Sequence, residues 1–315
     1  MTPPPRAPGG FTLAAFGLAV LLGGANFVAV RISNQELAPF WGASLRFGLA
    51  AALFIVIALA LRLRWPRGRQ LALTAVYGAL AFAISYALMY WALVRATAGT
   101  ATVVLAGVPL ATLLLATAQR LERLTPRAVI GSVLALAGIA WMVLGSSALT
   151  APIGAVVAMV GATVAIGQSI ILGKRLSGNH PIITNAVGMA TATPLLLTLS
   201  ASVNEPWALP RQPNVAVAVA YLITLGSAGL FVLVLLVVRK WTASASSYMF
   251  VLFPVVTLAL AAWLVHEPIT VPAVIGAALV MTGVWFGALS ATRTSAQLNP
   301  GGDTAERRRP DTTRP

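Results

Sequence analysis

The sequence contains no cysteine and few charged residues. None of the 315 residues is Cys, and Asp, Glu, Lys and Arg together make up 9%, against about 25% in an average soluble domain. Without cysteine the chain can form no disulfide, thiolate metal site or thiol redox centre. Hydrophobic residues make up 58%, so there is too little polar side chain to cover a water-soluble surface of this size. We therefore expect an integral membrane protein.

Signals for catalysis and for bound cofactors are also missing. The two histidines, His180 and His266, lie in predicted loops and are too few for a metal site and poorly placed for a catalytic triad. No Gly-Lys-Ser/Thr phosphate loop occurs, so ATP is not the evident energy source. No Asp or Glu lies in the middle of an apolar run. We expect a protein that is not an enzyme and that uses no metal or cofactor.

Long apolar runs separated by short polar breaks make up most of the chain. Each run is near or above the roughly 20 residues that a helix needs to cross about 30 Å of hydrocarbon, and continuous apolar runs favour helices over alternating strands. Segments 1–10 and 291–315 are predicted to be disordered tails. We predict ten transmembrane helices, at residues 11–31, 38–62, 70–93, 98–119, 126–146, 152–173, 181–202, 213–238, 243–265 and 270–290.

The distribution of Lys and Arg predicts the orientation of these helices. With the N-terminus in the cytoplasm, seventeen of the 21 basic residues fall inside: Arg6, Arg62, Arg64, Arg67, Arg69, Arg120, Arg123, Arg127, Lys174, Arg175, Arg239, Lys240, Arg293, Arg307, Arg308, Arg309 and Arg314. Three fall outside: Arg31, Arg95 and Arg211. This positive-inside bias places both termini in the cytoplasm. It also explains the net charge of +14 without nucleic acid, because the basic residues form no single patch.

The sequence repeats itself when it is shifted by 145 residues. The tetrapeptide AVIG at 128–131 falls on AVIG at 273–276, and the match needs no gap over about fifty residues. The same register pairs Arg95 with Lys240, Thr97 with Thr242, Ala98 with Ala243, Pro109 with Pro254, Glu122 with Glu267, Thr125 with Thr270 and Gly138 with Gly283. We therefore predict a duplication, with five helices in residues 11–146 and five in residues 152–290.

An odd number of helices in each half makes the second half enter the membrane upside down. The loop charges agree with this inversion. The loop after 98–119 carries Arg120, Arg123 and Arg127, whereas its counterpart after 243–265 contains no Lys or Arg. The predicted fold is an all-α integral membrane protein of two inverted five-helix repeats. Such repeats are typical of secondary transporters, which bind substrate between the repeats near the bilayer midplane.

Polar residues inside the predicted spans are the candidates for a substrate cavity. Arg46 is the one charged residue deep in a span, so we expect it to line the substrate path or to tie helices together. Snorkelling toward the interface is the alternative. The other candidates, for which interhelical hydrogen bonding is the alternative, are Asn26, Tyr86, Tyr90, Gln168, Asn185, Ser227 and Tyr248. Together they predict a mixed polar and aromatic cavity for small organic molecules.

Prolines and glutamates recur at matching positions of the two halves. Pro109 and Pro254 fall in the middle of spans, where each removes one helix hydrogen bond, and we predict matched hinges or gates, with a static kink as the alternative. Glu122 and Glu267 lie at span ends, where we expect capping or loop structure, with a proton-linked role as the alternative. Four glycines predict close packing of two helices: Gly131, Gly138, Gly276 and Gly283.

This pattern resembles the drug/metabolite transporter superfamily, specifically its ten-span EamA-type permeases, over about residues 11–290. The residues that carry the resemblance are Asn26-Phe27, Arg46-Phe47, Pro109, Glu122-Arg123-Leu124-Thr125, Gly131 and Gly138, then Pro254, Glu267-Pro268-Ile269-Thr270, Gly276 and Gly283. The sequence departs from the family where Gly23-Gly24-Ala25 replaces a frequent Trp-Gly pair, and where Leu121 and His266 stand in place of Gly before the glutamates. The family's substrates are therefore not carried over.

The resemblance implies export of metabolites such as amino acids, or of toxic compounds, across the bacterial cytoplasmic membrane. We expect a secondary-active exporter of small amino-acid-like or drug-like molecules that functions in the lipid bilayer as a monomer, since ten helices can enclose a site. An importer or a channel-like permease of the same fold is the nearest alternative. An intramembrane enzyme would need a catalytic polar cluster, and a scaffold or sensor would need long loops. The sequence specifies neither the substrate nor the coupling ion.

Overall fold

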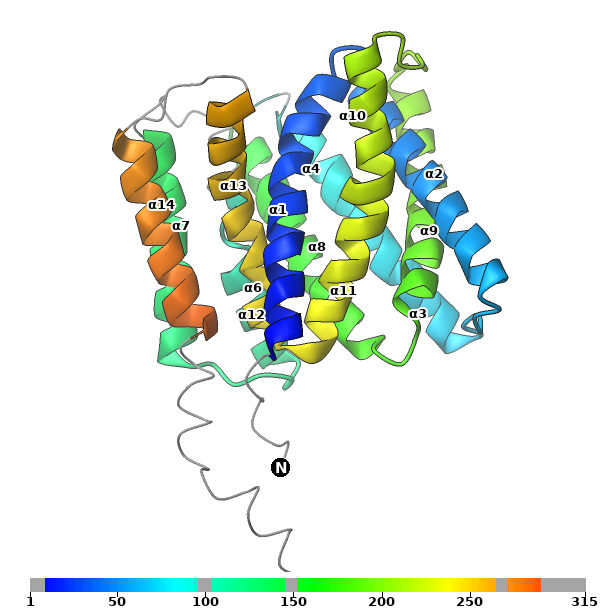
Figure 1. Ribbon diagram of the computed structural model, residues 1–315. Coiled ribbons are helices and arrows are strands. Elements are labelled where there is room, and N and C mark those ends of the chain that lie inside the picture. Colours follow the sequence, from blue (N-terminus) through cyan, green and yellow to red (C-terminus); the bar gives the residue numbers. More distant parts are fainter. Residues whose placement is uncertain (1–8, 94, 96–103, 145–151, 265–270, 290–315) are drawn as a thin grey trace, which may run out of the picture.

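The computed structural model is a bundle of helices (Figure 1). It describes residues 9–93, 95, 104–144, 152–264 and 271–289. The first half contains α1 (Gly10–Ser33), α2 (Pro39–Ala60), α3 (Arg69–Gly78), the π-helical segment η1 (Ala79–Ile84), α4 (Ser85–Leu93), α6 (Val108–Ala118) and α7 (Pro126–Leu144). The second contains α8 (Ile153–Arg175), α9 (Pro181–Ser202), α10 (Pro213–Ile223), the π-helical segment η2 (Thr224–Gly229), α11 (Leu230–Lys240), α12 (Ala243–Ser247), α13 (Met249–Leu264), α14 (Val271–Val284) and the π-helical segment η3 (Trp285–Leu289).

In the described part of the chain, six helices are long and apolar enough to cross a membrane: Gly10–Ser33, Pro39–Ala60, Arg69–Ala92, Ile153–Arg175, Pro181–Ser202 and Pro213–Lys240. They lie in the first, second, third, sixth, seventh and eighth predicted spans. Shorter apolar helices lie in the other four spans: Val108–Ala118, Pro126–Trp141, Ala243–Thr257 and Val274–Ala288. An all-helical fold is confirmed for the described part of the chain. The count of ten crossings stays a prediction.

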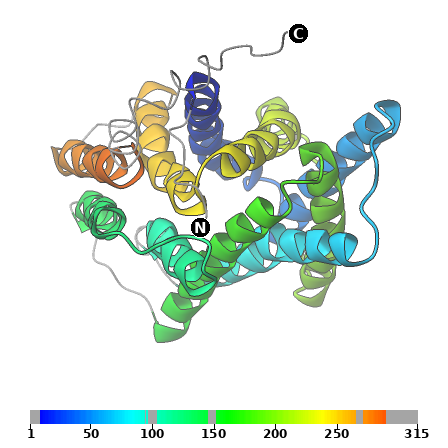
Figure 2. The same cartoon turned by 90° about the horizontal axis from the view of Figure 1, so that it is seen from below.

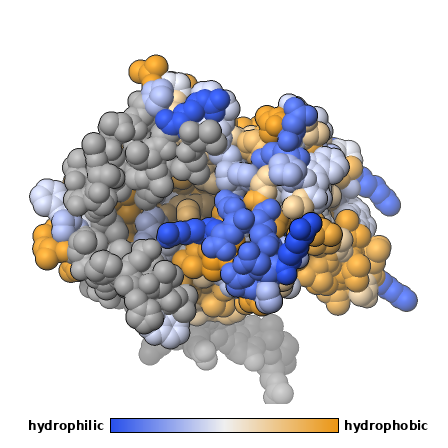
Figure 3. All heavy atoms as spheres, turned by 90° about the horizontal axis from the view of Figure 1, so that it is seen from above, coloured by the Kyte–Doolittle hydropathy of each residue, from blue (hydrophilic) through white to orange (hydrophobic). Residues whose placement is uncertain are grey.

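The flanks of the bundle expose large apolar side chains. Ile153, Val217 and Trp263 are 85%, 70% and 74% exposed, whereas soluble proteins rarely expose broad apolar surfaces of this kind. Seen from the upper end, where α1 ends and α2 begins, hydrophilic side chains gather over the middle of the face (Figure 3). Apolar flanks beside a polar upper end fit a protein surrounded by lipid.

Helix boundaries recur along the chain. Both α2 and α9 contain 22 residues, and the second residue beyond each helix, Arg62 or Asn204, has a positive φ of 50° or 55°. The π-helical segments η1 and η2 start 145 residues apart and both contain six residues. This spacing equals the shift found in the sequence. Because π-helical turns are rare, their recurrence in the same register is a strong sign of related halves.

Corresponding helices pack against each other in opposite directions. The start of α2 meets the end of α9, because the N–H groups of Phe40 and Trp41 donate to Glu205, 3.1 and 2.8 Å away. The helices α7 and α14 also cross antiparallel, with Gly131 against Gly283 and Gly138 against Gly276. The pair α7 and α14 forms one edge of the bundle, and α2 and α9 lie toward the opposite edge (Figure 2).

The glycines of α7 and α14 bring the two backbones into direct contact. A Cβ atom on Gly138 would lie 2.7 Å from the carbonyl oxygen of Gly276, and one on Gly283 would lie 2.6 Å from the nitrogen of Ala135. Neither position has room for a side chain. The predicted close packing of these glycines is therefore confirmed. Small residues at such crossings supply van der Waals contact that lipid cannot replace.

The prolines predicted to kink spans occupy different positions in their helices. Pro109 lies in the first turn of α6, directly after a break at Ala106 and Gly107, where its missing N–H removes no helical hydrogen bond. Pro109 therefore starts a helix rather than kinking one. Pro254 lies inside α13, which a turn at Tyr248 separates from α12. A hinge role for either proline stays a prediction.

We predict that Gly138→Ala lowers the thermal unfolding midpoint of the purified protein in detergent. Its new methyl group meets backbone atoms of α14, and such overpacking costs about 1–3 kcal/mol. The control is Gly17→Ala in α1, where no atom lies within 4 Å of the new Cβ and helix propensity favours alanine by about 1 kcal/mol. Equal midpoints for the two variants would contradict the close crossing of α7 and α14.

Candidate functional site

Arg46 is buried inside the bundle, where it joins α2 to α4. Its side chain is 3% exposed, and its Nη2 donates a hydrogen bond to the hydroxyl of Tyr86. The guanidinium carbon lies 4.4 Å from the ring centre of Phe47 and 4.9 Å from that of Tyr86. Such contacts between a cation and aromatic faces are attractive. Arg46 therefore packs between helices.

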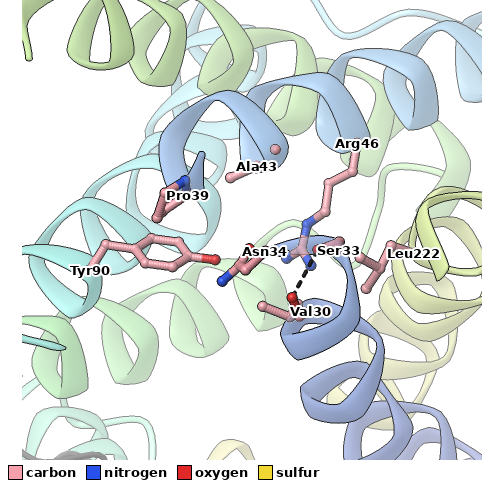
Figure 4. A pocket seen from close by; sticks show the side chains of 9 residues that line it. Val30, Ser33, Asn34, Pro39, Ala43, Arg46, Tyr90 and Leu222 are labelled. Carbon is pink, nitrogen blue, oxygen red and sulfur yellow. Dashed lines mark hydrogen bonds between the residues drawn. The ribbon is translucent and has the colours of Figure 1, made fainter. Parts of the chain in front are cut away.

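The Arg46 guanidinium borders a small hollow near the upper end of the bundle. Figure 4 shows Arg46 reaching from α2 toward Ser33 of α1, while the hydroxyl of Tyr90 points into the same space from α4. The other residues that line the hollow are Val30, Asn34, Pro39, Gly42, Ala43 and Leu222. Its volume is about 10 Å³, near the minimum for one water molecule. An organic ligand can therefore enter only if the surrounding helices move apart.

An aromatic cluster lies next to Arg46, where the two π-containing helices meet. Phe82 of η1 and Phe231, two residues beyond η2, form an edge-to-face pair with ring centres 4.7 Å apart. Phe47 contacts both rings, and Tyr86 packs edge-on against Phe47 at 5.1 Å. Edge-to-face pairs stabilise such packing beyond the area they bury. The helix α3–η1–α4 of the first half thus meets α10–η2–α11 of the second beside the hollow.

Asn26 attaches α1 to the second π-helical segment. Its Nδ2 donates to the carbonyl of Gly226 at 2.9 Å, and Gly226 directly precedes Ser227. A second bond, from the hydroxyl of Tyr221 to the carbonyl of Leu22 at 2.9 Å, joins the same two helices. The Oδ1 atom of Asn26 and the Oγ atom of Ser227 are buried without a partner in the described residues.

The other three predicted site residues lie apart from Arg46. Gln168 of α8 accepts a 2.8 Å hydrogen bond from Gln119, next to the end of α6. Tyr248 shares a 2.9 Å hydrogen bond with Ser132 of α7 and donates to a carbonyl of the same helix. Asn185 is fully buried near the start of α9. Neither polar atom of its side chain has a partner in the described part of the chain.

Buried polar atoms without a described partner distinguish four of the eight predicted residues from the others. Tyr86, Gln168 and Tyr248 bond to protein groups, as expected of residues that join helices. Four others hold a buried polar atom that no described group satisfies: Asn26, Arg46, Asn185 and Ser227. A buried group of this kind costs about 1–3 kcal/mol, so its presence points to a bound water or ligand. The remaining residue, Tyr90, lines the hollow. A binding role for each residue stays a prediction.

At the lower end, a carboxylate of the first half caps a helix of the second half. Glu122, which follows α6, accepts hydrogen bonds from the N–H of Ala243 at 2.5 Å and that of Ser244 at 3.2 Å, and from the Ser244 hydroxyl. These groups start α12, where negative charge is favourable. Capping, predicted for Glu122, is thereby confirmed. Glu267, its counterpart in the repeat, lies outside the described residues.

Two more carboxylates join the halves at the upper end, and sequence reasoning did not find them. Glu36 accepts from the backbone N–H groups of Arg211 and Gln212 at 2.7 and 3.3 Å, just before α10. Glu205 accepts from the start of α2. Their position in the sequence was the signal that could have found them. A single carboxylate in a short loop between apolar helices has few roles other than capping a neighbouring helix.

The glycines that depart from the family pattern allow α13 to approach α1. A Cβ on Gly23 would lie 2.2 Å from the ring of Phe253, and one on Gly24 would lie 2.5 Å from Cβ of Val256. The space beside these glycines is therefore filled by the second half of the chain. A larger side chain at either position would push α13 away from α1.

Comparisons with known proteins agree with this architecture. The model of the EamA-like transporter family matches the chain twice, at residues 11–144 and 153–288. An uncharacterized transporter of Archaeoglobus fulgidus is 28% identical over 272 residues, which cover 85% of this chain and 95% of the relative. A crystal structure with 21% sequence identity shares the fold, with a TM-score of 0.76 over 90% of this chain and 98% of the other.

The apolar flanks and the long apolar helices are those of a multi-pass membrane protein, and the family match makes it a membrane transporter. The chain belongs to the EamA-like transporter family.

We predict different effects on stability for Tyr248, whose hydroxyl is hydrogen-bonded, and for Ser227, whose hydroxyl has no partner in the described residues. Tyr248→Phe removes two hydrogen bonds and strands buried partners on α7, so it should destabilise the protein by about 1–3 kcal/mol. Ser227→Ala removes a buried hydroxyl that bonds to no described group, so the unfolding midpoint should stay constant or rise. The two midpoints are compared in detergent without added ligand. A large loss of stability in Ser227→Ala would show that its hydroxyl has a structural partner.

Proposed function

We propose that this protein is a secondary-active exporter of small organic molecules that alternates between two inverted five-helix repeats, residues 11–146 and 152–290. The observation that carries the proposal is the shared 145-residue spacing of the sequence repeat and of η1 and η2. The opposite directions of α2 and α9 support the inversion. Two related halves of opposite orientation give inward-open and outward-open states of similar energy.

The proposed substrate site lies where the two halves meet. The first half contributes Arg46, Tyr86 and Tyr90, and the second contributes Phe231 and the neighbourhood of Ser227. Aromatic surfaces with a few oriented polar groups are typical of sites for small organic molecules. The hollow is too small for such a ligand, so this conformation holds the site nearly closed, and substrate entry requires helix movement.

The π-helical segments are places where the helices can bend during such a movement, and the glutamate caps are contacts that can break and form again. A π-helical turn marks a place where a helix bends or shifts register at low cost, and it is often found at functional sites. Opening the lower end would separate Glu122 from α12. Opening the upper end would separate Glu36 from the start of α10, and Glu205 from the start of α2. We propose that these caps close the two ends in turn.

We assign the lower end to the cytoplasm and place both termini there. The basic residues Arg62, Arg64 and Arg67 lie in the loop between α2 and α3, and Arg120 and Lys240 follow or end helices at the same end. The upper end carries fewer basic residues, and the positive-inside rule relates this asymmetry to orientation. Export is the direction in which the family resemblance points, and import by the same cycle is the second candidate.

Cells that overproduce the protein should release one class of small molecule into the medium. Mass spectrometry compares the medium with that of cells carrying an empty vector and of cells with an equal amount of Arg46→Ala. We expect a compound class that accumulates only with the natural sequence, because the variant lacks the charged group of the site. Depletion of a compound from the medium would instead indicate import. Identical media would contradict export of an endogenous metabolite.

Joining the two halves at the lower end should stop transport. Because the chain has no cysteine, Glu122→Cys with Ser244→Cys gives two unique thiols at contacting positions. A short bifunctional methanethiosulfonate should abolish transport of the compound identified above, and reduction should restore it. The single variants treated with the same reagent are the controls. Undiminished transport in the cross-linked protein would contradict alternating access at this end and favour a channel-like permease.

A further inference from the structure

Among the described residues, Arg46 is a buried positive charge that contacts no carboxylate. It is the one ionised side chain that is buried in the described part of the chain. Its contacts are the Tyr86 hydroxyl and the faces of two aromatic rings, all of them neutral, and its Nε atom is buried without a partner. A charge inside a membrane is costly and is usually paired or functional.

The carboxylates of the described residues are committed elsewhere. Glu122 caps α12, Glu36 binds the backbone before α10, and Glu205 binds the start of α2. None of these three carboxylates forms an ion pair with Arg46. The hydrogen-bond partner that the structure describes for Arg46 is the Tyr86 hydroxyl. In the described part of the chain no carboxylate is in direct contact with the guanidinium; Glu205 binds the start of the same helix, and two tyrosines and an asparagine lie close by.

The surroundings of Arg46 define the missing partner. The hollow that it borders is lined by the apolar Val30, Pro39 and Leu222 and by neutral polar groups of Asn34 and Tyr90. One positive charge matches one negative charge, which disfavours a doubly charged phosphate. A guanidinium binds a planar carboxylate through two parallel hydrogen bonds. The apolar lining and the neighbouring phenylalanines suit an uncharged hydrocarbon body.

We propose that the transported molecule is a monocarboxylate with an apolar body, and that Arg46 binds its carboxylate while the neighbouring aromatic side chains contact its body. This inference rests on the proposed transport function and specifies the ligand of the same site. The carboxylate would replace or share the Tyr86 hydroxyl as the partner of the guanidinium. It would also satisfy the Nε atom, which has no partner in the closed hollow.

Matched ligands test this proposal without a variant. The purified protein is heated in detergent with butanoate, 4-methylpentanoate or 3-phenylpropionate, and with the carboxamide of each acid. We expect at least one carboxylate to raise the unfolding midpoint, with an apparent affinity about tenfold or more above that of its carboxamide, because the carboxamide lacks the charge-assisted bond. Equal effects of acid and amide, or no effect of any acid, would overturn the proposal.

Variants of Arg46 test whether the effect arises at this residue. Arg46→Gln should abolish the preference for the carboxylate, whereas Arg46→Lys should keep part of it, because it retains the charge without the planar fork. Size-exclusion elution reports whether each variant is folded. If neither variant folds, the comparison of acid and amide in the unaltered protein still tests the proposal. Persistence of the preference in folded Arg46→Gln would overturn the assignment.

The ligand-binding experiment and the transport experiment can fail independently of each other. If cells export a compound that is not a carboxylate and no acid stabilises the protein, transport stands and the monocarboxylate proposal fails. If an acid binds through Arg46 but neither export nor import is observed, the ligand assignment stands and the transport proposal fails.

Discussion

The structure depends on one constraint, which is that the hydrocarbon interior of a membrane offers no water to polar groups. Backbone N–H and C=O groups must therefore bond within the chain, and helices achieve this locally. The same constraint explains why hydroxyl and amide side chains join helices, as Tyr248 joins the start of α13 to α7 and Gln119 joins α6 to α8. It also explains why glutamates at both ends bind the free N–H groups of helix starts.

Most polar groups inside the bundle have a hydrogen-bond partner, so the buried polar groups without one are candidates for ligand binding. Asn26, Arg46 and Ser227 lie on the helices that surround the contact between the two halves. Asn26 and Arg46 are each held by one hydrogen bond while another of their polar atoms stays unpaired in the described residues, and the hydroxyl of Ser227 has no described partner. A site that must release its ligand cannot be fully satisfied by the protein itself. We propose that these three groups are available to bind a substrate; Thr117, Asn185 and Arg239 also hold an unpaired buried atom in the described residues.

The sequence specified the helices and the duplication well, because both depend on patterns that run through the whole chain. Apolar runs set the positions of the six long helices to within a few residues, whereas α6 begins at Val108 inside the predicted span 98–119, and the 145-residue shift reappears in η1 and η2. Glycine spacing predicted the crossing of α7 and α14 correctly. These features depend on composition and on spacing along the chain, and so they can be read from the sequence without coordinates.

The arrangement of the site could be predicted only in part. Arg46 and the two tyrosines were found because charge and phenol groups are rare in apolar helices. Their separation from Tyr248 was not predictable, because polar residues on different helices give no sign of which ones meet. The π-helical segments were also missed, since Ala79–Ile84 looks like ordinary helix. Pro109 was placed in the middle of a span because the apolar run continues through the break at Ala106 and Gly107.

The central claim is that the two ends of the bundle open in turn, and distances between spin labels test it most directly. In the cysteine-free chain, one label pair is placed at the upper end (Arg95→Cys with Arg211→Cys) and another at the lower end (Arg67→Cys with Lys240→Cys). Double electron–electron resonance in lipid nanodiscs should give two distances for each pair, and any condition that lengthens one pair should shorten the other. A single distance at each end, or lengthening at both ends together, would contradict alternating access.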